Sequence, residues 1–169
     1  MGSTQLDPIS NRIARIKAGE DPQALGRMVS GWAIFSNQQP GPITGCCMLL
    51  PDLPDALLGD SGCGATPAHL NDLPGAARAA FLSDVALLGD VVAEATGCER
   101  LNYLMLCNQV PVLHAHVVPR FADEDAQKRL LGPFEAYDFP GAPKAEAKGA
   151  HKELFARLLD AFSRLAGVG

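Results

Sequence analysis

The chain has 169 residues, which is enough for one domain with an ordinary hydrophobic core. Apolar residues make up 47% and charged residues 20% of the sequence, and this is the composition of a globular protein. The net charge of −5 argues against a broad nucleic-acid surface, because such a surface needs a basic face. It does not exclude a small anionic substrate that a local cluster of donors binds.

The cysteines and the apolar runs bear on the cellular compartment. The five cysteines, an odd number with two adjacent, do not resemble a disulfide framework, and no C-x-x-C pair supports a zinc site. We expect five free thiols in a cytoplasmic protein, at Cys46, Cys47, Cys63, Cys98 and Cys107. No signal peptide is recognisable and no apolar stretch approaches the ~20 residues of a membrane span, so we expect no membrane partner.

The first elements are predicted from apolar periodicity and from turn residues. Residues 1–8 are expected to be disordered. Residues 9–19 predict a short helix at the sheet edge, with Ser10 as a candidate N-cap. Residues 31–36 and 43–50 predict two strands of a hairpin, because a turn-forming segment rich in Asn, Gln, Pro and Gly separates them.

A long helix and two loops follow. Residues 51–68 are rich in Pro, Gly, Asp and Ala without a period, and we expect a loop insertion that acts as a lid or is mobile. Residues 74–96 repeat apolar side chains at steps of three and four, which predicts an amphipathic helix lying across a sheet. Breakers predict a loop over residues 132–149, and residues 151–165 predict a closing helix.

Two further strands complete the predicted sheet. Residues 101–107 form an apolar strand that ends at Asn108 and Gln109, and a tight connection would make it the antiparallel neighbour of the strand that begins at Val112. The predicted fold is a single α+β domain over residues 1–169, with an antiparallel sheet of about five strands. The helix at residues 74–96 covers one face, and a pocket lies on the other.

The strand from Val112 to Arg120 carries two histidines, His114 and His116. Because side chains alternate along a strand, both imidazoles project from one face, roughly 6–7 Å apart. Such a pair suits a metal ion, a histidine nucleophile with a neighbouring donor, or two strand histidines that only satisfy hydrogen bonds. The pattern by itself favours the last of these.

The flanking residues add a resemblance. The run from Val112 to Arg120, with its closing Pro-Arg pair, resembles the signature of the histidine triad (HIT) family, and the Leu-His-Ala-His core resembles a bacterial branch of it. The middle histidine of that signature is the nucleophile and falls on His114, and the third falls on His116. The first falls on Val112, which departs from the triad. The resemblance covers about residues 9–165.

The resemblance implies a nucleotide hydrolase or nucleotidyl transferase that acts at the α-phosphate through a nucleotidyl-histidine at His114. His116 would donate to a phosphate oxygen or to the leaving group. Asn108, and less strongly Gln109, would donate to phosphate oxygens, although both also suit a turn. Asn37 matches the position that contacts the ribose, or it is a turn asparagine that bonds its own backbone.

The family also implies a homodimer and no metal held by the protein, although the nucleotide could carry Mg²⁺. Since the first histidine is missing, a second hypothesis is a non-catalytic nucleotide-binding or interaction module. A third is a metal-dependent enzyme that uses the His-x-His pair, for which no further ligand stands at a recognisable spacing.

Overall fold

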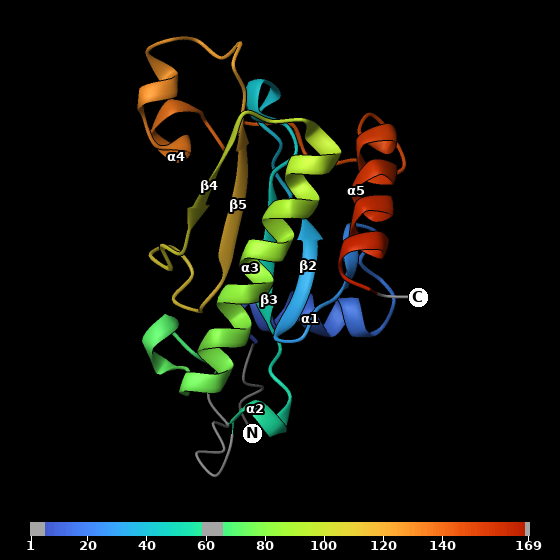
Figure 1. The fold of residues 1–169 in the computed structure, drawn as a ribbon, viewed down its shortest axis with the longest axis vertical. Helices are drawn as coiled ribbons and strands as arrows, with labels where there is room; N and C mark the ends of the chain where they lie inside the picture. Colours follow the sequence, from blue (N-terminus) through green and yellow to red (C-terminus); the bar gives the residue numbers. More distant parts are fainter. Residues whose placement is uncertain (1–5, 59–65, 168–169) are drawn as a thin grey trace.

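The computed structural model describes residues 6–58 and 66–167. Its centre is a five-stranded antiparallel sheet with the order β1-β2-β3-β5-β4 (Figure 1). The strands are β1 (Ala24–Arg27), β2 (Gly31–Phe35), β3 (Cys47–Pro51), β4 (Arg100–Leu104) and β5 (Ala115–Arg120). The predicted α+β class, the hairpin of β2 and β3, and the antiparallel pairing of β4 with β5 are confirmed.

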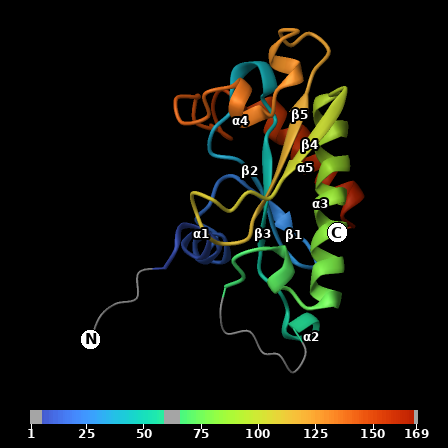
Figure 2. The same cartoon turned by 90° about the vertical axis from the view of Figure 1, so that its left-hand side faces the viewer.

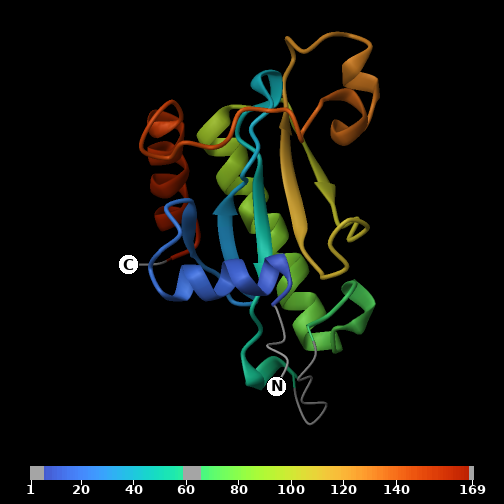
Figure 3. The same ribbon diagram turned by 180° about the vertical axis from the view of Figure 1, so that it is seen from behind.

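Helices lie on both faces of this sheet. Two long helices, α3 (Gly75–Thr96) and α5 (Lys152–Leu165), lie on one face, and α1 (Pro8–Lys17) lies on the other (Figure 2). Seen from behind, α1 crosses β2 and β3 (Figure 3). Helix α3 ends at Gly97, whose φ of +66° lies in the left-handed region that glycine adopts without strain.

Two predicted loops contain short helices. Helix α2 (Asp55–Leu58) interrupts the segment 51–68, whose first residue closes β3, and α4 (Pro133–Ala136) interrupts the segment 132–149. Residues 59–65 lie outside the described residues, so the central part of the predicted insertion does too. Helix α4 lies on the same side of the sheet as α1 (Figure 2).

The N-terminal helix differs from its prediction in three respects. It begins at Pro8, inside the range assigned to disorder, and residues 1–5 lie outside the described part of the chain. Its N-cap is Asp7, whose carboxylate accepts hydrogen bonds of 2.9 Å from the backbone N–H groups of Ile9 and Ser10, so Ser10 is not the cap. The helix packs on the sheet face and not on its edge, because Ile9 and Ile16 are buried there.

Strand β1 was absent from the sequence prediction, because four residues without alternation give no strand signal. Its place depends on packing against α5. A Cβ atom added at Gly26 would lie 2.3 Å from a ring carbon of Phe162, so the helix can approach this closely only over glycine.

Among the described residues, the buried hydrophobic side chains form one large cluster and two small ones. The large cluster fills the α3 face and includes Phe35, Leu49, Phe81, Leu88, Leu113, Ala115 and Val117. The opposite face carries what we call the α1 cluster, namely Ile9, Ile16, Ile34, Leu50 and Val112. It also carries what we call the α4 cluster, namely Ile43, Cys46, Val118, Ala136 and Tyr137.

Cys46, Cys47, Cys98 and Cys107 are free thiols, and Cys63 lies outside the described residues. Across residues 6–58 and 66–167, no helix combines the length and the apolar character needed to cross a bilayer.

Candidate active site

The two histidines lie where the α1 and α4 clusters meet. Strand β5 begins at Ala115 and not at the predicted Val112, so His114 directly precedes the strand and His116 lies within it. The predicted alternation nevertheless holds, because Leu113 and Ala115 enter the large core while Val112 enters the α1 cluster. The two imidazole rings lie 5.0 Å apart between centroids, at an angle of 74°.

A backbone carbonyl fixes the tautomer of His114. The Nδ1 atom lies 2.7 Å from the carbonyl oxygen of Val112. A carbonyl oxygen only accepts hydrogen bonds, so Nδ1 carries the proton, and in the neutral ring Nε2 keeps a free lone pair. The side chain is 8% exposed. The ring is therefore held with Nε2 on the side away from the anchoring hydrogen bond.

Residue 112 serves this arrangement through its backbone. The valine side chain is buried in the α1 cluster, next to apolar residues of α1 and of two strands. Its carbonyl oxygen supplies the acceptor that orients His114. The departure from the triad thus leaves the orientation of His114 intact, because orientation here depends on the main chain and not on the side chain at position 112.

His116 lies in an apolar setting. Burial, with a smaller contribution from the neighbouring His114, lowers its pKa to about 4. At neutral pH the ring is uncharged and offers one N–H donor. Across the sheet it pairs with Met48 on one side and Leu104 on the other.

The amide residues predicted for the site lie at the surface. Asn108 and Gln109 are exposed in the connection of β4 to β5, which spans residues 105–114 and is not the tight turn that was predicted. In this connection Cys107 has a φ of +51°, and the backbone N–H of Leu113 donates to the carbonyl of Pro67 at 2.7 Å. No hydrogen bond among the described residues joins either amide to a histidine.

Asn37 lies just past the end of β2 and is exposed. It lines a polar cavity of about 360 Å³ together with residues of α1 and the following turn, among them Asn11, Arg12 and Gln23. Its backbone carbonyl oxygen accepts a hydrogen bond of 2.7 Å from the backbone N–H of Ala145, so the segment that precedes α5 is hydrogen-bonded to the end of β2.

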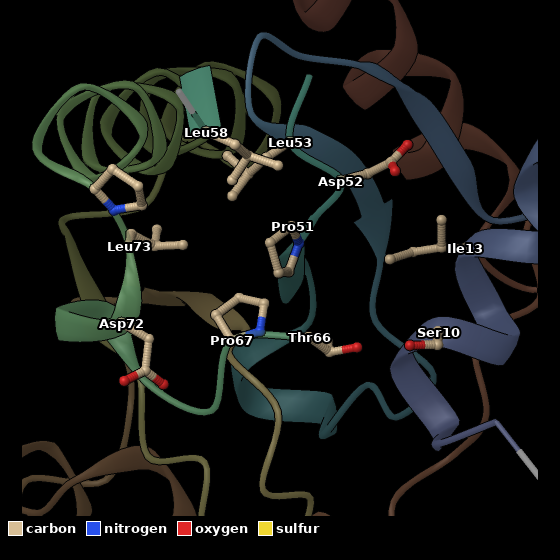
Figure 4. A pocket seen from close by; sticks show the side chains of 11 residues that line it. Ser10, Ile13, Pro51, Asp52, Leu53, Leu58, Thr66, Pro67, Asp72 and Leu73 are labelled. Carbon is tan, nitrogen blue, oxygen red and sulfur yellow. The ribbon is translucent and has the colours of Figure 1, made fainter. Parts of the chain in front are cut away.

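A second cavity, of about 260 Å³, lies between α1, the end of β3 and residues 66–74, and Figure 4 shows the side chains that line it. Apolar side chains such as Ile13, Leu53 and Leu73 line it, and Asp52 and Asp72 stand at its border. Neither histidine is among its lining residues. The Asp52 carboxylate accepts hydrogen bonds from Lys17, Arg27 and the indole of Trp32.

Sequence reasoning missed the segment that covers His116. The ring of Phe134, which directly follows the first residue of α4, lies 5.1 Å from the His116 ring at 79°, and it also contacts Phe139 at 4.4 Å. The only sequence signal was a pair of phenylalanines among turn residues, and nothing local connects them to a strand twelve or more residues earlier.

A buried arginine anchors that segment. All of the N–H groups of Arg120 have acceptors, and its Nε and Nη2 atoms form a two-pronged pair with the Glu124 carboxylate at 2.8–3.1 Å. Tyr137 donates to the same carboxylate at 2.8 Å. The other acceptors of Arg120 are Asn102 Oδ1 and the carbonyl oxygens of Lys128 and Leu131. The Arg of the Pro-Arg pair is thus a structural anchor in this chain.

Within residues 6–58 and 66–167, no group of three or more His, Cys, Asp or Glu side chains is placed to hold a metal ion.

No protein-family model matches this chain, and no curated protein sequence matches it. A histidine triad protein from Sinorhizobium meliloti has a TM-score of 0.63 at 20% identity, over 93% of this chain and 96% of that one. A histidine triad protein from Marinobacter aquaeolei reaches 0.61 at 18% identity, over 96% and 98%. A hypothetical histidine triad nucleotide-binding protein from Sulfolobus tokodaii reaches 0.61 at 13% identity, over 92% and 93%.

At sequence identities this low, structural similarity shows the fold alone. The matches extend over nearly the whole of each chain. The expectation drawn from the histidine signature is met at that level: the chain has the fold of the histidine triad proteins.

Proposed function

We propose that this protein is a nucleotide hydrolase or nucleotidyl transferase that acts at the α-phosphate. One observation carries the proposal: the Nδ1 atom of His114 lies 2.7 Å from the Val112 carbonyl, so Nε2 is free to act as a nucleophile. The fold adds support, because one protein with a similar structure is described as a histidine triad nucleotide-binding protein.

The proposed reaction has two steps. The Nε2 lone pair of His114 attacks the α-phosphorus, a new N–P bond forms, and the bond from phosphorus to the leaving group breaks. Water then cleaves the nucleotidyl-histidine and restores the imidazole; in a transferase another acceptor takes the place of water. His116, uncharged at neutral pH, donates its N–H to a phosphate oxygen or to the leaving group.

The polar residues at the surface complete the proposal. Asn108 stabilises charge on the phosphate oxygens, with Gln109 as a second donor, and Asn37 contacts the ribose. The protein itself supplies no metal ion, and any Mg²⁺ comes with the nucleotide. We further propose a homodimer, as the family resemblance implies, and a cytoplasmic location, as the cysteine content indicates.

A second candidate is a nucleotide-binding module without turnover. The packing of Val112 favours it, because the position of the first triad histidine is occupied by a buried apolar side chain. Both candidates use the same nucleotide site, and they differ only in whether the covalent intermediate forms.

Trapping of the intermediate separates the two candidates. The protein is incubated with a nucleotide labelled at the α-phosphorus, quenched in alkali and analysed for a label on His114, since a phosphorus–imidazole bond is acid-labile. The exposed His69 provides a matched control, as His69→Ala should retain the label and His114→Ala should lose it. Absence of label from the wild-type protein with every nucleotide conjugate tried would leave the binding module.

A further inference from the structure

The two phenylalanines beside His116 form a partly open aromatic wall. Phe134 meets the imidazole edge to face at 5.1 Å, and Phe139 packs against Phe134 at 4.4 Å. Phe134 is 37% exposed, so part of its ring remains available to a ligand. An aromatic ring with one free side binds flat or apolar groups well, because the contact removes the apolar surface of both from water.

The wall is fixed in place and does not hang loosely over the site. Arg120, Glu124 and Tyr137 are between 4% and 8% exposed, and they bind one another through short hydrogen bonds. Breaking a buried pair of this kind is costly, since one charge would lose its partner. The segment that carries Phe134 is therefore tied to β5, the strand that carries His116.

The order of strands indicates which part of a substrate this wall would meet. Asn37 follows β2, His116 lies on β5, and β4 is the edge strand beyond it. Leu104 of β4 and Phe139 both pack against the α4 cluster. If the ribose lies near Asn37, the nucleoside lies on the β2 side of the phosphate. The leaving group is on the opposite side of the phosphorus, and it therefore lies toward β4 and the aromatic wall.

The character of this wall is apolar. Phe134 contacts His116, and Met48 and Leu104 pair with it across the sheet. The His116 ring is itself uncharged at neutral pH. A leaving group rich in phosphate charge would gain nothing from these side chains, whereas a group with an aromatic body would bury its surface against them.

We propose that Phe134, supported by Phe139, is a specificity-determining residue that contacts the leaving group and selects nucleotide conjugates whose leaving group has an aromatic body. The inference rests on the proposed function. For an amine conjugate, the His114–phosphorus bond forms as the phosphorus–nitrogen bond breaks, and the amine takes up a proton that His116 relays from water. Hydrolysis of the nucleotidyl-histidine then returns the free imidazole and a nucleoside monophosphate.

Two adenosine 5′-phosphoramidates test the selection, one made with benzylamine and one with ethylamine. We expect wild-type kcat/KM to favour the benzyl conjugate about tenfold, as burial of a phenyl ring would give. Phe134→Ala should bring the ratio close to one, and Phe134→Leu should give a value between the two. Leu82→Ala is the control, because Leu82 is 41% exposed on α3 on the opposite side of the sheet, and it should keep the wild-type ratio.

A binding measurement separates this inference from the proposed reaction. In a His114→Ala background, which cannot form the intermediate, calorimetry gives the Kd of both conjugates, and Phe134→Ala is then added to it. A tighter Kd for the benzyl conjugate that disappears with Phe134→Ala supports the aromatic site even if no turnover is ever seen. Equal Kd values for the two conjugates, a preference that survives Phe134→Ala, or no binding of either conjugate overturns it.

Discussion

The two faces of the sheet around β5 differ in how they are packed. On the α3 face, Leu113, Ala115 and Val117 belong to one continuous core that runs beneath the long helix. On the opposite face the apolar packing is divided into the α1 cluster and the α4 cluster, and His114 and His116 lie between them. The continuous core holds the strand, whereas the apolar packing of the other face is interrupted at the two histidines.

On the face opposite α3, one residue contributes both to packing and to the orientation of a histidine. The Val112 side chain is packed in the α1 cluster, while its carbonyl oxygen orients His114. Stability and orientation therefore depend on different atoms of the same residue. Substitutions on the α3 face should lower stability, and those between the clusters should lower activity.

The largest effect is expected from His114→Ala. Removal of the nucleophile closes the covalent path, so turnover should fall to background while the fold and nucleotide binding persist. Single-turnover kinetics measures the turnover, circular dichroism the fold, and calorimetry the nucleotide binding. Turnover equal to wild type on every substrate would end the hydrolase hypothesis.

His116→Ala should have the next largest effect, again on activity. It removes one donor to developing charge, and loss of such a donor typically costs about 10²–10³ in kcat. A measurable rate should remain, unlike in His114→Ala. If His116→Ala were the more damaging of the two, the assignment of the nucleophile would have to be exchanged.

Leu113→Ala tests the other side of the comparison. Leu113 is fully buried in the large core, and its truncation leaves a cavity that should lower the free energy of unfolding by about 2–5 kcal/mol. Urea titration at a temperature where both proteins fold measures this loss. The activity of the folded fraction should change far less than in the histidine variants, although residue 113 is adjacent to His114.

Sequence patterns predicted the parts of this fold that local periodicity encodes. Helix α3, the β2–β3 hairpin and the alternation at His114 and His116 all follow from apolar spacing. Strand β1 could not be predicted, because its glycine at position 26 is explained only by the Phe162 ring above it. The N-cap was misplaced by three residues, since Asp7 and Ser10 both satisfy the local rule.

The candidate site likewise contains residues that the sequence predicted and residues that it did not. The histidine pair follows from the sequence, whereas the acceptor at the Val112 carbonyl does not, because any residue provides a carbonyl. The aromatic wall was missed for a different reason: Phe134 reaches His116 only through the Arg120 anchor, a contact between segments far apart in the chain. The roles of Asn37, Asn108 and Gln109 stay predictions.

Val112→His sharpens the distinction between side chain and carbonyl. The acceptor for His114 is already present, so restoring the first triad histidine should not raise activity per folded molecule. It should lower stability by about 1–3 kcal/mol, because it places a polar ring in the apolar α1 cluster. Chemical denaturation together with kcat measures both outcomes. A clear gain in kcat would show that the side chain at position 112 limits the reaction.

The smallest effect concerns the pH dependence of stability. The pKa of His116 is lowered from 6.5 to about 4 in the folded protein, so between these values the unfolded chain binds a proton that the folded chain does not. The contribution of His116 to the free energy of unfolding is thus fully present above about pH 6.5 and is lost as the pH falls toward 4. The shift corresponds to about 3 kcal/mol at most, and because His116 is only partly buried we expect about 1–2 kcal/mol.

The measurement is the change in unfolding free energy between pH 7 and pH 5, for the wild type and for His116→Gln. Carboxylates with lowered pKa, such as those of Asp7, Asp21 and Glu124, titrate alike in both proteins and cancel. A variant that loses as much stability as the wild type over this range would show that burial of His116 does not govern the acid response.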